Sequence, residues 1–335
     1  MNKDSRRGAA LIVALWVLLL LSMMIGSFAY EMRVESEVTA YGRNRFKAQY
    51  LAQAGVEWAK VALTKKVEKG TEGDLVIDDG EDLDLAVAAN NLEKGVPATG
   101  LKKELGAGFF TLDIMPEEGR RNVNMLTDSD WEEILDQSGV PQEMWPELID
   151  CFTDWVDPGD EHRLNGAESD DAYYKDQGYE CKNAPLDTAD ELLRIKGFTE
   201  QIVFGGPGEN EEDPPMTGII QWLTTYGDGK VNVNTASREV LMTFVGMEEQ
   251  MVDEILERRL GVDGQSNTKD DGLKDLGEIP GMTAELSARL TTSDRKYIRV
   301  VSIGEVNGVK SGVWCILQVA ESSVVPLFWR EEAMP

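Results

Sequence analysis

The sequence is poor in the residues that most enzymes use for chemistry. It has one histidine and three cysteines among 335 residues, too few for an ordinary Cys/His zinc site. It contains no G-x-S-x-G, no glycine-rich phosphate loop and no H-E-x-x-H, and His162 has no nucleophile motif around it. These absences favour a protein that is not an enzyme.

Positive charge is also scarce. Lysine and arginine number 33, against 61 aspartate and glutamate residues, which gives a net charge of −28. A surface of this kind argues against binding nucleic acid or anionic lipid headgroups through the soluble part. It suits solubility, and it suits divalent cations.

Charge is absent from one long stretch near the N-terminus. After the Arg6–Arg7 pair no charged residue occurs before Glu31, and the stretch contains no proline. About 20 uncharged residues are enough for a helix to span a bilayer. The arginine pair should hold the leader on the cytoplasmic side. We therefore expect a single membrane span, with the bulk of the chain tethered on the far side of the membrane.

Three interpretations of this segment remain open. It can be a secretory signal cleaved after Ser27-Phe28-Ala29, a plain signal anchor, or a type 4 prepilin leader. A prepilin leader would be residues 1–8, cut between Gly8 and Ala9, and would leave residues 9–66 as the N-terminal helix with 9–30 spanning the membrane. The basic leader that ends in glycine before an unbroken apolar helix favours the third.

The second half of that helix carries a stripe of small residues. Its members fall alternately four and three apart: Ala48, Ala52, Gly55, Ala59 and Ala62. A stripe of this kind lets another backbone approach closely. We expect it to pack against this protein's own sheet; packing against a partner helix is the alternative, and both can hold for different turns.

Strand patterns occur on both sides of a long helical middle. The patterns lie at Gly108–Met115, Lys296–Val301 and Val313–Ala320, with weaker ones at Asp74–Ile77 and Asp84–Val87. A small antiparallel sheet interrupted by an insertion explains this order. The expected fold class is α+β: a long N-terminal helix packed on a sheet from residues 67–119 and 291–335, with a large α-helical domain, 120–290, inserted into this head.

The helical middle contains a weak internal repeat. Asn122-Val123-Asn124 and Asn232-Val233-Asn234 each precede a capped helix, at 131–137 and 238–244. Four glycines also lie between helical runs, in the layout of helix-hairpin-helix units: Gly139, Gly197, Gly246 and Gly281. Acidic residues follow three of these glycines and would repel phosphate, so we expect compact helix pairs that do not bind nucleic acid.

The densest functional signal is the acidic loop Asp150–Glu180. It holds ten acidic residues against Arg163 and Lys175. Carboxylates in an irregular loop suit Ca²⁺, which takes six to eight oxygen ligands. The candidate ligands are Asp154, Asp157, Asp160, Glu168, Asp170 and Asp171. The spacing differs from that of an EF-hand, and a solvated loop held by tyrosine and tryptophan packing is the alternative. For a second acidic loop, Asp263–Asp275, the solvated interpretation is favoured.

Two cysteines bracket this acidic loop. In an oxidising compartment Cys151 and Cys181 would close a loop of about 30 residues, a contribution of roughly 3–4 kcal/mol in the chain-entropy model. Two separate thiols are the alternative. Cys315 lies in an apolar strand pattern and is expected to be a buried free thiol.

Together these features resemble one family, the type II secretion system minor pseudopilin K. The resemblance rests on Arg7-Gly8-Ala9-Ala10-Leu11, the run Tyr50 to Glu57 (YLAQAGVE), Asp154-Trp155-Val156-Asp157, Asn165-Gly166-Ala167-Glu168, Tyr173-Tyr174 and Val231-Asn232-Val233-Asn234-Thr235-Ala236. It covers nearly the whole chain. Ala9 as the first mature residue departs from the usual Phe or Met, which bears on N-methylation there.

The resemblance implies a structural role. Most pseudopilins have glutamate at the fifth mature position, whereas this sequence has Val13, as the K-type subunit does. A tip subunit has no neighbour above it whose N-terminal ammonium needs neutralising. The family further implies calcium in the inserted domain, the minor pseudopilins I and J as partners, and processing by the prepilin peptidase. The alternative function is a membrane-anchored periplasmic Ca²⁺-binding adhesive or interaction protein, whose N-terminus would stay uncleaved.

Overall fold

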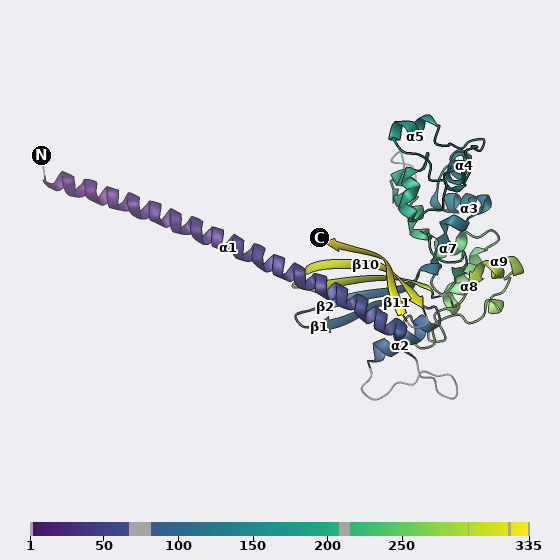
Figure 1. The fold of residues 1–335 in the computed structure, drawn as a ribbon. Helices are drawn as coiled ribbons and strands as arrows, with labels where there is room; N and C mark the ends of the chain where they lie inside the picture. The colour runs from purple at the N-terminus through teal and green to yellow at the C-terminus, as the bar shows by residue number, and fades with distance from the viewer. Residues whose placement is uncertain (1–2, 67–81, 208–214, 294, 321–322, 334–335) are drawn as a thin grey trace.

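The structure is a computed structural model that describes residues 3–66, 82–207, 215–293, 295–320 and 323–333. It begins with the helix α1, Lys3–Thr64, whose N-terminal half extends away from the rest of the molecule (Figure 1). The described part of this helix, from Ile12, contains an apolar window of mean hydropathy 2.4, none of it buried. It is long and apolar enough to cross a membrane.

The head is a single antiparallel sheet of five strands in the order β1-β2-β9-β10-β11. The strands are β1, Ala98–Leu105; β2, Gly108–Pro116; β9, Tyr297–Val306; β10, Val309–Ala320; and β11, Ser323–Ala333. Asn307 and Gly308, both at positive φ, form the two-residue turn between β9 and β10, a combination typical of tight hairpins. The long insert between β2 and β9 thus interrupts the sheet in sequence and leaves it continuous in space.

The C-terminal half of α1 packs on one face of this sheet through its small residues. A Cβ built on Gly55 would lie 2.1 Å from Ser302 Oγ, and one on Gly304 would lie 2.0 Å from the carbonyl oxygen of Ala48. Ala48 and Ala52 are fully buried. The prediction that the stripe packs on the protein's own sheet is confirmed for these turns, since only small residues permit so close an approach.

One predicted strand is a helix. Asp84–Val87 lies within α2, Leu83–Glu93, and α2 contacts both α1 and β1. The Asp82 carboxylate caps this helix by accepting hydrogen bonds from the backbone N–H groups of Asp84 and Leu85, at 3.1 and 3.3 Å. The cap and the alanine-rich sequence that follows favour helix over strand. The other weak strand pattern, Asp74–Ile77, lies outside the described residues.

The insert consists of short helices and two-residue strands. Its α-helices are α3, Asp128–Ser138; α4, Trp145–Val156; α5, Ala172–Gln177; α6, Glu200–Phe204; α7, Arg238–Met242; α8, Glu249–Arg258; and α9, Ala284–Arg289. Its 3₁₀ helices are η1, Glu117–Gly119; η2, Val123–Met125; η3, Gln142–Met144; η4, Ala189–Arg194; η5, Ile219–Trp222; and η6, Leu276–Glu278. Its strands are β3, Arg121–Asn122; β4, Gly205–Gly206; β5, Met216–Thr217; β6, Leu223–Thr224; β7, Val231–Asn232; and β8, Leu290–Thr291.

The predicted repeat is present in the insert. A first unit, residues 121–224, is closed by the parallel pair β3–β6, and a second unit, residues 231–291, by the parallel pair β7–β8. In the first, the Asn124 side chain brackets the backbone of Leu186, with distances of 3.0 Å to its oxygen and 2.7 Å to its nitrogen. Asn234 does the same to Leu273 at 3.0 and 2.8 Å.

The predicted glycine hinges also occur at corresponding points of the two units. All four have the positive φ that favours glycine: 82° at Gly139, 90° at Gly197, 81° at Gly246 and 83° at Gly281. Each glycine lies between two helical segments, as the sequence pattern predicts. The helical insert is therefore built from two copies of one arrangement.

A buried ion-pair cluster joins the two units. The Asp130 carboxylate, from the first unit, pairs with Arg121 at 2.6 Å and with Arg289 of the second unit. The Phe244 ring lies under both guanidinium groups, 4.0 Å from that of Arg121 and 5.1 Å from that of Arg289. Burial alone would raise the pKa of the Asp130 carboxyl, but the hydrogen bond from Arg289 and the charge of Arg121 lower it to about 2.

Candidate functional site: an acidic loop folded over α4

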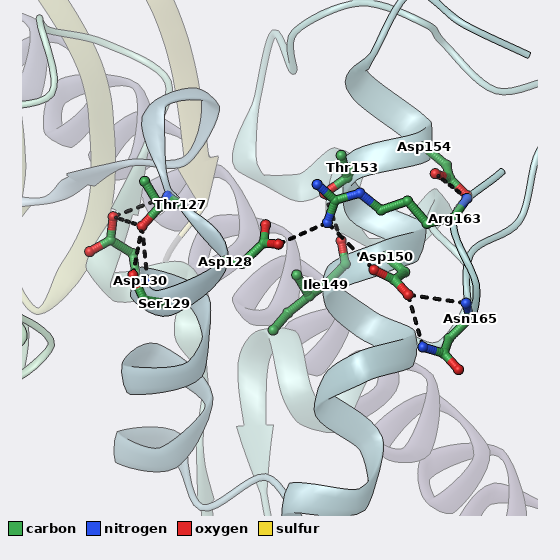
Figure 2. Close-up of polar contacts among 10 residues, drawn as sticks. All are labelled: Thr127, Asp128, Ser129, Asp130, Ile149, Asp150, Thr153, Asp154, Arg163 and Asn165. Carbon is green, nitrogen blue, oxygen red and sulfur yellow. Dashed lines mark hydrogen bonds and ion pairs between the residues drawn. The ribbon is translucent and has the colours of Figure 1, made fainter. Parts of the chain in front are cut away.

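The acidic loop of the first unit is organised by two aspartates on α4. Asp150 and Asp154 are four residues apart and therefore lie on one face of the helix. The returning loop donates to both (Figure 2): the Arg163 backbone N–H lies 3.1 Å from each carboxylate oxygen of Asp154. The backbone N–H and side-chain amide of Asn165 lie 3.0 and 2.9 Å from Asp150 Oδ2.

Arg163 neutralises part of this charge. Its guanidinium lies 3.0 Å from Asp128 at the start of α3 and 3.4 Å from Asp150 (Figure 2). The loop is thereby tied to two helices. The sequence contained one signal for this role, because Arg163 is one of only two basic residues between Asp150 and Glu180.

Two other carboxylates of the loop are buried without such a cation. Asp154 is 0% exposed and Glu168 is 2% exposed. Neither carboxylate oxygen of Glu168 has a hydrogen-bond partner among the described residues. Burial raises the pKa of the Glu168 carboxyl, and the nearby Asp154 and Asp157 raise it further. Burial likewise raises the pKa of Asp154, against the backbone hydrogen bond from Arg163.

Gly166 lets the loop lie directly against Asp154. A Cβ built on this glycine would fall 1.8 Å from Asp154 Oδ2. The next residue, Ala167, is buried, and Glu168 follows it into the interior. The Asn-Gly-Ala-Glu sequence therefore brings a second carboxylate toward the first, and glycine is needed because any side chain would displace Asp154.

The remaining candidate ligands have other roles. Asp157 ends α4 and accepts a hydrogen bond from the Gly159 backbone at 2.9 Å, and Asp160 is exposed. Asp171 caps α5 and pairs with Lys196 at 3.1 Å. Asp170 is exposed and accepts from Lys175 through its backbone oxygen.

Of the six predicted ligands, Asp154 and Asp157 lie near enough to Glu168 to raise the pKa of its carboxyl. Within the described ranges, no three histidine, cysteine, aspartate or glutamate side chains converge as a metal cluster. The negative charge of the site suits a cation. The six predicted ligands, however, do not converge on one point. Calcium binding stays a prediction.

Aromatic side chains of the loop pack against one another and against α4. The Trp155 ring lies 5.6 Å from that of Tyr174 and 6.1 Å from that of Tyr179, between ring centroids. Tyr173 packs edge-on to Tyr174 at 5.2 Å. These contacts pack the loop against α4.

Cys151 and Cys181 are buried in the same core and are free thiols in the structure. Each sulfur lies 3.7 Å from a backbone oxygen of the loop, that of Asn165 for Cys151 and that of Ala167 for Cys181. Burial raises the pKa of Cys151 to about 12 and that of Cys181 to about 11. The disulfide between them is not formed here and stays a prediction. Cys315 is buried in β10, also as a free thiol.

The second acidic loop occupies the corresponding place in the second unit and is satisfied internally. Asp270 accepts from the Val262 backbone at 2.8 Å and from the Thr268 hydroxyl at 2.9 Å. The buried Asp271 accepts from the Thr268 backbone at 3.1 Å, and its other oxygen lies 2.9 Å from the same Thr268 hydroxyl, which has one proton for the two aspartates. Burial raises the pKa of the Asp271 carboxyl, against these hydrogen bonds.

The fold defines a class of protein: a pilin-like head on a long apolar helix, with a helical domain inserted into the sheet. Residues 116–204 match the family model described as Type II secretion system (T2SS), protein K. No curated protein sequence matches the chain. A chain in the crystal structure of the GspK-GspI-GspJ complex from the enterotoxigenic Escherichia coli Type 2 Secretion System has the same fold. The TM-score is 0.50 at 13% identity, over 91% of this chain and 100% of that one.

The match to the type II secretion system protein K family thus falls within the segment that begins at the helical insert, and the similar structure shares the overall fold. The matched segment, which begins at the last residue of β2, contains the acidic loop and most of the first unit.

Proposed function

We propose that the protein is the minor pseudopilin at the tip of a type II secretion pseudopilus, where it helps to start assembly of the filament for protein export across the outer membrane. The observation that carries the proposal is the position of the family match. It falls on the domain that distinguishes this chain from a plain pilin-like head, while α1 supplies the helix by which such a head joins a filament.

The proposed partners are the minor pseudopilins I and J of the same system. Support comes from the similar structure, which was determined as a complex of GspK with GspI and GspJ. The exposed apolar and aromatic side chains of α1, including Tyr41, Phe46 and Tyr50, offer surface for neighbouring helices.

The proposed location is the inner membrane, with a single span and the C-terminal bulk in the periplasm. The prepilin peptidase would cut between Gly8 and Ala9, leaving the apolar part of α1 on the mature protein. N-terminal mass mapping of the membrane-extracted protein tests this step. A mature start at Ala9 is expected, while a retained Met1 or a start at Tyr30 contradicts the prepilin interpretation and would favour a differently anchored periplasmic protein.

The proposed bound ion is Ca²⁺, held by Asp154 and Glu168 with Asp157 beside them. Support comes from the two orphaned oxygens of Glu168 and from the raised pKa of both buried carboxyls. A bound cation would supply positive charge to this buried cluster and fix the loop on α4. Its role here is structural.

The tip position is tested at Val13. In a mature chain beginning at Ala9 this is the fifth residue, where other pseudopilins carry glutamate. Val13→Glu would place a carboxylate in lipid or the filament core without a partner, at a cost of several kcal/mol unless it protonates. Val13→Leu is the matched control and should secrete normally. Secretion by the Val13→Glu strain at the wild-type level contradicts the tip proposal; loss of the complex with the I and J subunits supports it.

A further inference from the structure

A cleft of about 430 Å³ lies between the sheet and the first unit of the insert. Its sheet wall is the face turned away from α1. Val300 and Cys315 are buried toward α1, and strand side chains alternate between faces. The residues beside them, Val301 and Trp314, therefore line the opposite face and this cleft.

The sheet wall is apolar and aromatic. The Trp314 and Phe328 rings, from β10 and β11, meet edge-on with centroids 4.5 Å apart. Val301 and Ile316 continue this surface, and Ile220 faces them from the insert. Concave sites of a few hundred Å³ lined by apolar and aromatic side chains, with few polar groups, are the usual form of binding sites.

The cleft also holds a guanidinium that has no side-chain partner in the described part of the chain. Arg299 is fully engaged with Glu117, through distances of 2.7 and 2.6 Å from its Nε and Nη2 to the two carboxylate oxygens. Arg120 lines the same cleft, and its backbone N–H donates to the Glu117 carbonyl oxygen at 3.2 Å. Its guanidinium makes no hydrogen bond, and no ion pair within 4 Å, with any residue that the structure describes. Burial and the neighbouring Arg299 lower the pKa of Arg120 to about 10, against the attraction of Glu117.

A carboxylate would supply the negative charge and the hydrogen-bond acceptors that this guanidinium lacks. Arginine binds carboxylates through two parallel hydrogen bonds, and burial makes such a pair stronger and its absence costlier. In a chain of net charge −28, an arginine that lines an apolar cleft and whose guanidinium has no partner among the described residues stands out as a recognition group.

We propose that this cleft binds an apolar segment of a partner polypeptide through a single carboxylate, which pairs with Arg120 while its neighbouring side chains pack on Trp314 and Phe328. The inference rests on the cleft alone and does not require the family assignment. It adds to the proposed function a docking site that lies away from the helix α1.

The charge of the molecule favours a polypeptide over a free small anion. A net charge of −28 repels small anions from the surface as a whole, so a carboxylate needs further contacts to stay bound. A polypeptide supplies them through apolar side chains and through polar groups at the rim of the cleft. That rim carries both signs, with Arg330 and Glu332 from β11 and Asp187 from the insert.

The test uses the full-length chain in detergent and two fluorescently labelled peptides, acetyl-Ala-Leu-Glu-Phe-Ala-amide and the same peptide with glutamine in place of glutamate. Fluorescence polarisation should show the glutamate peptide binding about tenfold tighter, a difference of 1.4 kcal/mol. Arg120→Gln should remove this preference, and Arg120→Lys should keep part of it. The control is Arg238→Gln, at an exposed arginine that pairs with Glu249 and Asp253 outside the cleft, and should leave binding unchanged.

A second variant keeps the test decisive if Arg120→Gln does not fold. Ala189→Trp fills the cleft from η4 and leaves Arg120 in place, so both peptides should lose binding. Equal affinity of the two peptides for the wild type, or no saturation below millimolar concentration, overturns the proposal. Competition by 3-phenylpropanoate as strong as that by the glutamate peptide overturns the polypeptide occupant in favour of a small apolar carboxylate.

Discussion

The two units of the insert share a framework and differ in how their acidic loops are neutralised. Asn124 and Asn234 hold equivalent backbone positions, and each unit closes with a parallel strand pair. In the second unit the buried Asp271 finds hydrogen-bond donors within its own loop. In the first, the Glu168 carboxylate has no hydrogen-bond donor among the residues that the structure describes.

The features that the two units share are structural, whereas the acidic loops in which they differ are candidates for binding. The asparagines and the hinge glycines recur because each unit needs a side chain that hydrogen-bonds its loop backbone and a tight turn between its helices. The loops between corresponding helices are free to diverge, since their ends are already fixed. Among the described residues of the two loops, only Glu168 is buried with both carboxylate oxygens unpartnered, so the first loop is the one expected to need a ligand from solution.

The largest expected effect comes from breaking the joint between the units. Asp130→Ala leaves the buried Arg121 without its carboxylate, which should cost about 3–5 kcal/mol of unfolding free energy. Chemical denaturation of the full chain measures this. Asp253→Ala, which removes an exposed pair with Arg238, is the control and should cost no more than about 1 kcal/mol. Similar losses for both would show that the joint does not couple the units.

Next in size is the predicted disulfide, which would exist only in the first unit. Closure of a loop of about 30 residues between Cys151 and Cys181 should stabilise the protein by roughly 3–4 kcal/mol in the chain-entropy model. Non-reducing peptide mapping of periplasmic material should recover the linked pair, with Cys315 free. Recovery of both Cys151 and Cys181 as thiols would refute the pairing and leave them as the buried thiols seen here.

Calcium should stabilise the first unit selectively. A ligand that binds only the folded state contributes about 2.7 kcal/mol at 100 times its Kd, so Tm should rise with calcium and fall with chelator. Magnesium should have little effect because it demands a stricter geometry. Asp154→Ala or Asp157→Ala should remove most of the rise, while Asp270→Ala in the second unit should matter less. A melting curve that does not change between millimolar calcium and chelator would contradict calcium binding and leave both acidic loops as solvated surface.

The smallest expected effect is a pH dependence in chelator. Folding raises the pKa of the Glu168 carboxyl above its ordinary value of 4.5, so the folded state binds more protons there than the unfolded state does. Stability should therefore fall as pH rises from about 4.5 through the raised pKa. Glu168→Gln should flatten that part of the Tm–pH curve. An unchanged slope in this variant would show that Glu168 is not the group responsible.

Some strands were predictable from the sequence and others were not. The pattern at Gly108–Met115 corresponds to β2, and that at Val313–Ala320 falls within β10, because alternation and β-branched residues mark half-buried strands. β1 was missed because its exposed side chains are largely lysine and glutamate. β11 was missed because Pro326 interrupts it, which an edge strand tolerates at an irregularity in its pairing.

For the candidate site, the sequence identified the loop without its internal arrangement. It indicated that too many carboxylates lie between Asp150 and Glu180, and Asp154 and Glu168 are among the six predicted ligands. It could not tell these two from Asp170 and Asp171, because burial depends on where the loop meets α4. Nor could it show that Arg163 pairs with Asp128 and Asp150.

The sequence by itself determined the features that depend on local periodicity and turn chemistry. These are the long apolar helix with its small-residue stripe, the interrupted sheet, the Asn-x-Asn repeats and the glycine hinges. Tertiary structure alone decided which charges meet: Asp130 with Arg289, Arg163 with Asp128, and the Arg120 guanidinium with no partner among the described residues. The reason is physical. A backbone pattern is set within a few residues, whereas the environment of a buried charge is set by segments that can lie more than a hundred residues apart.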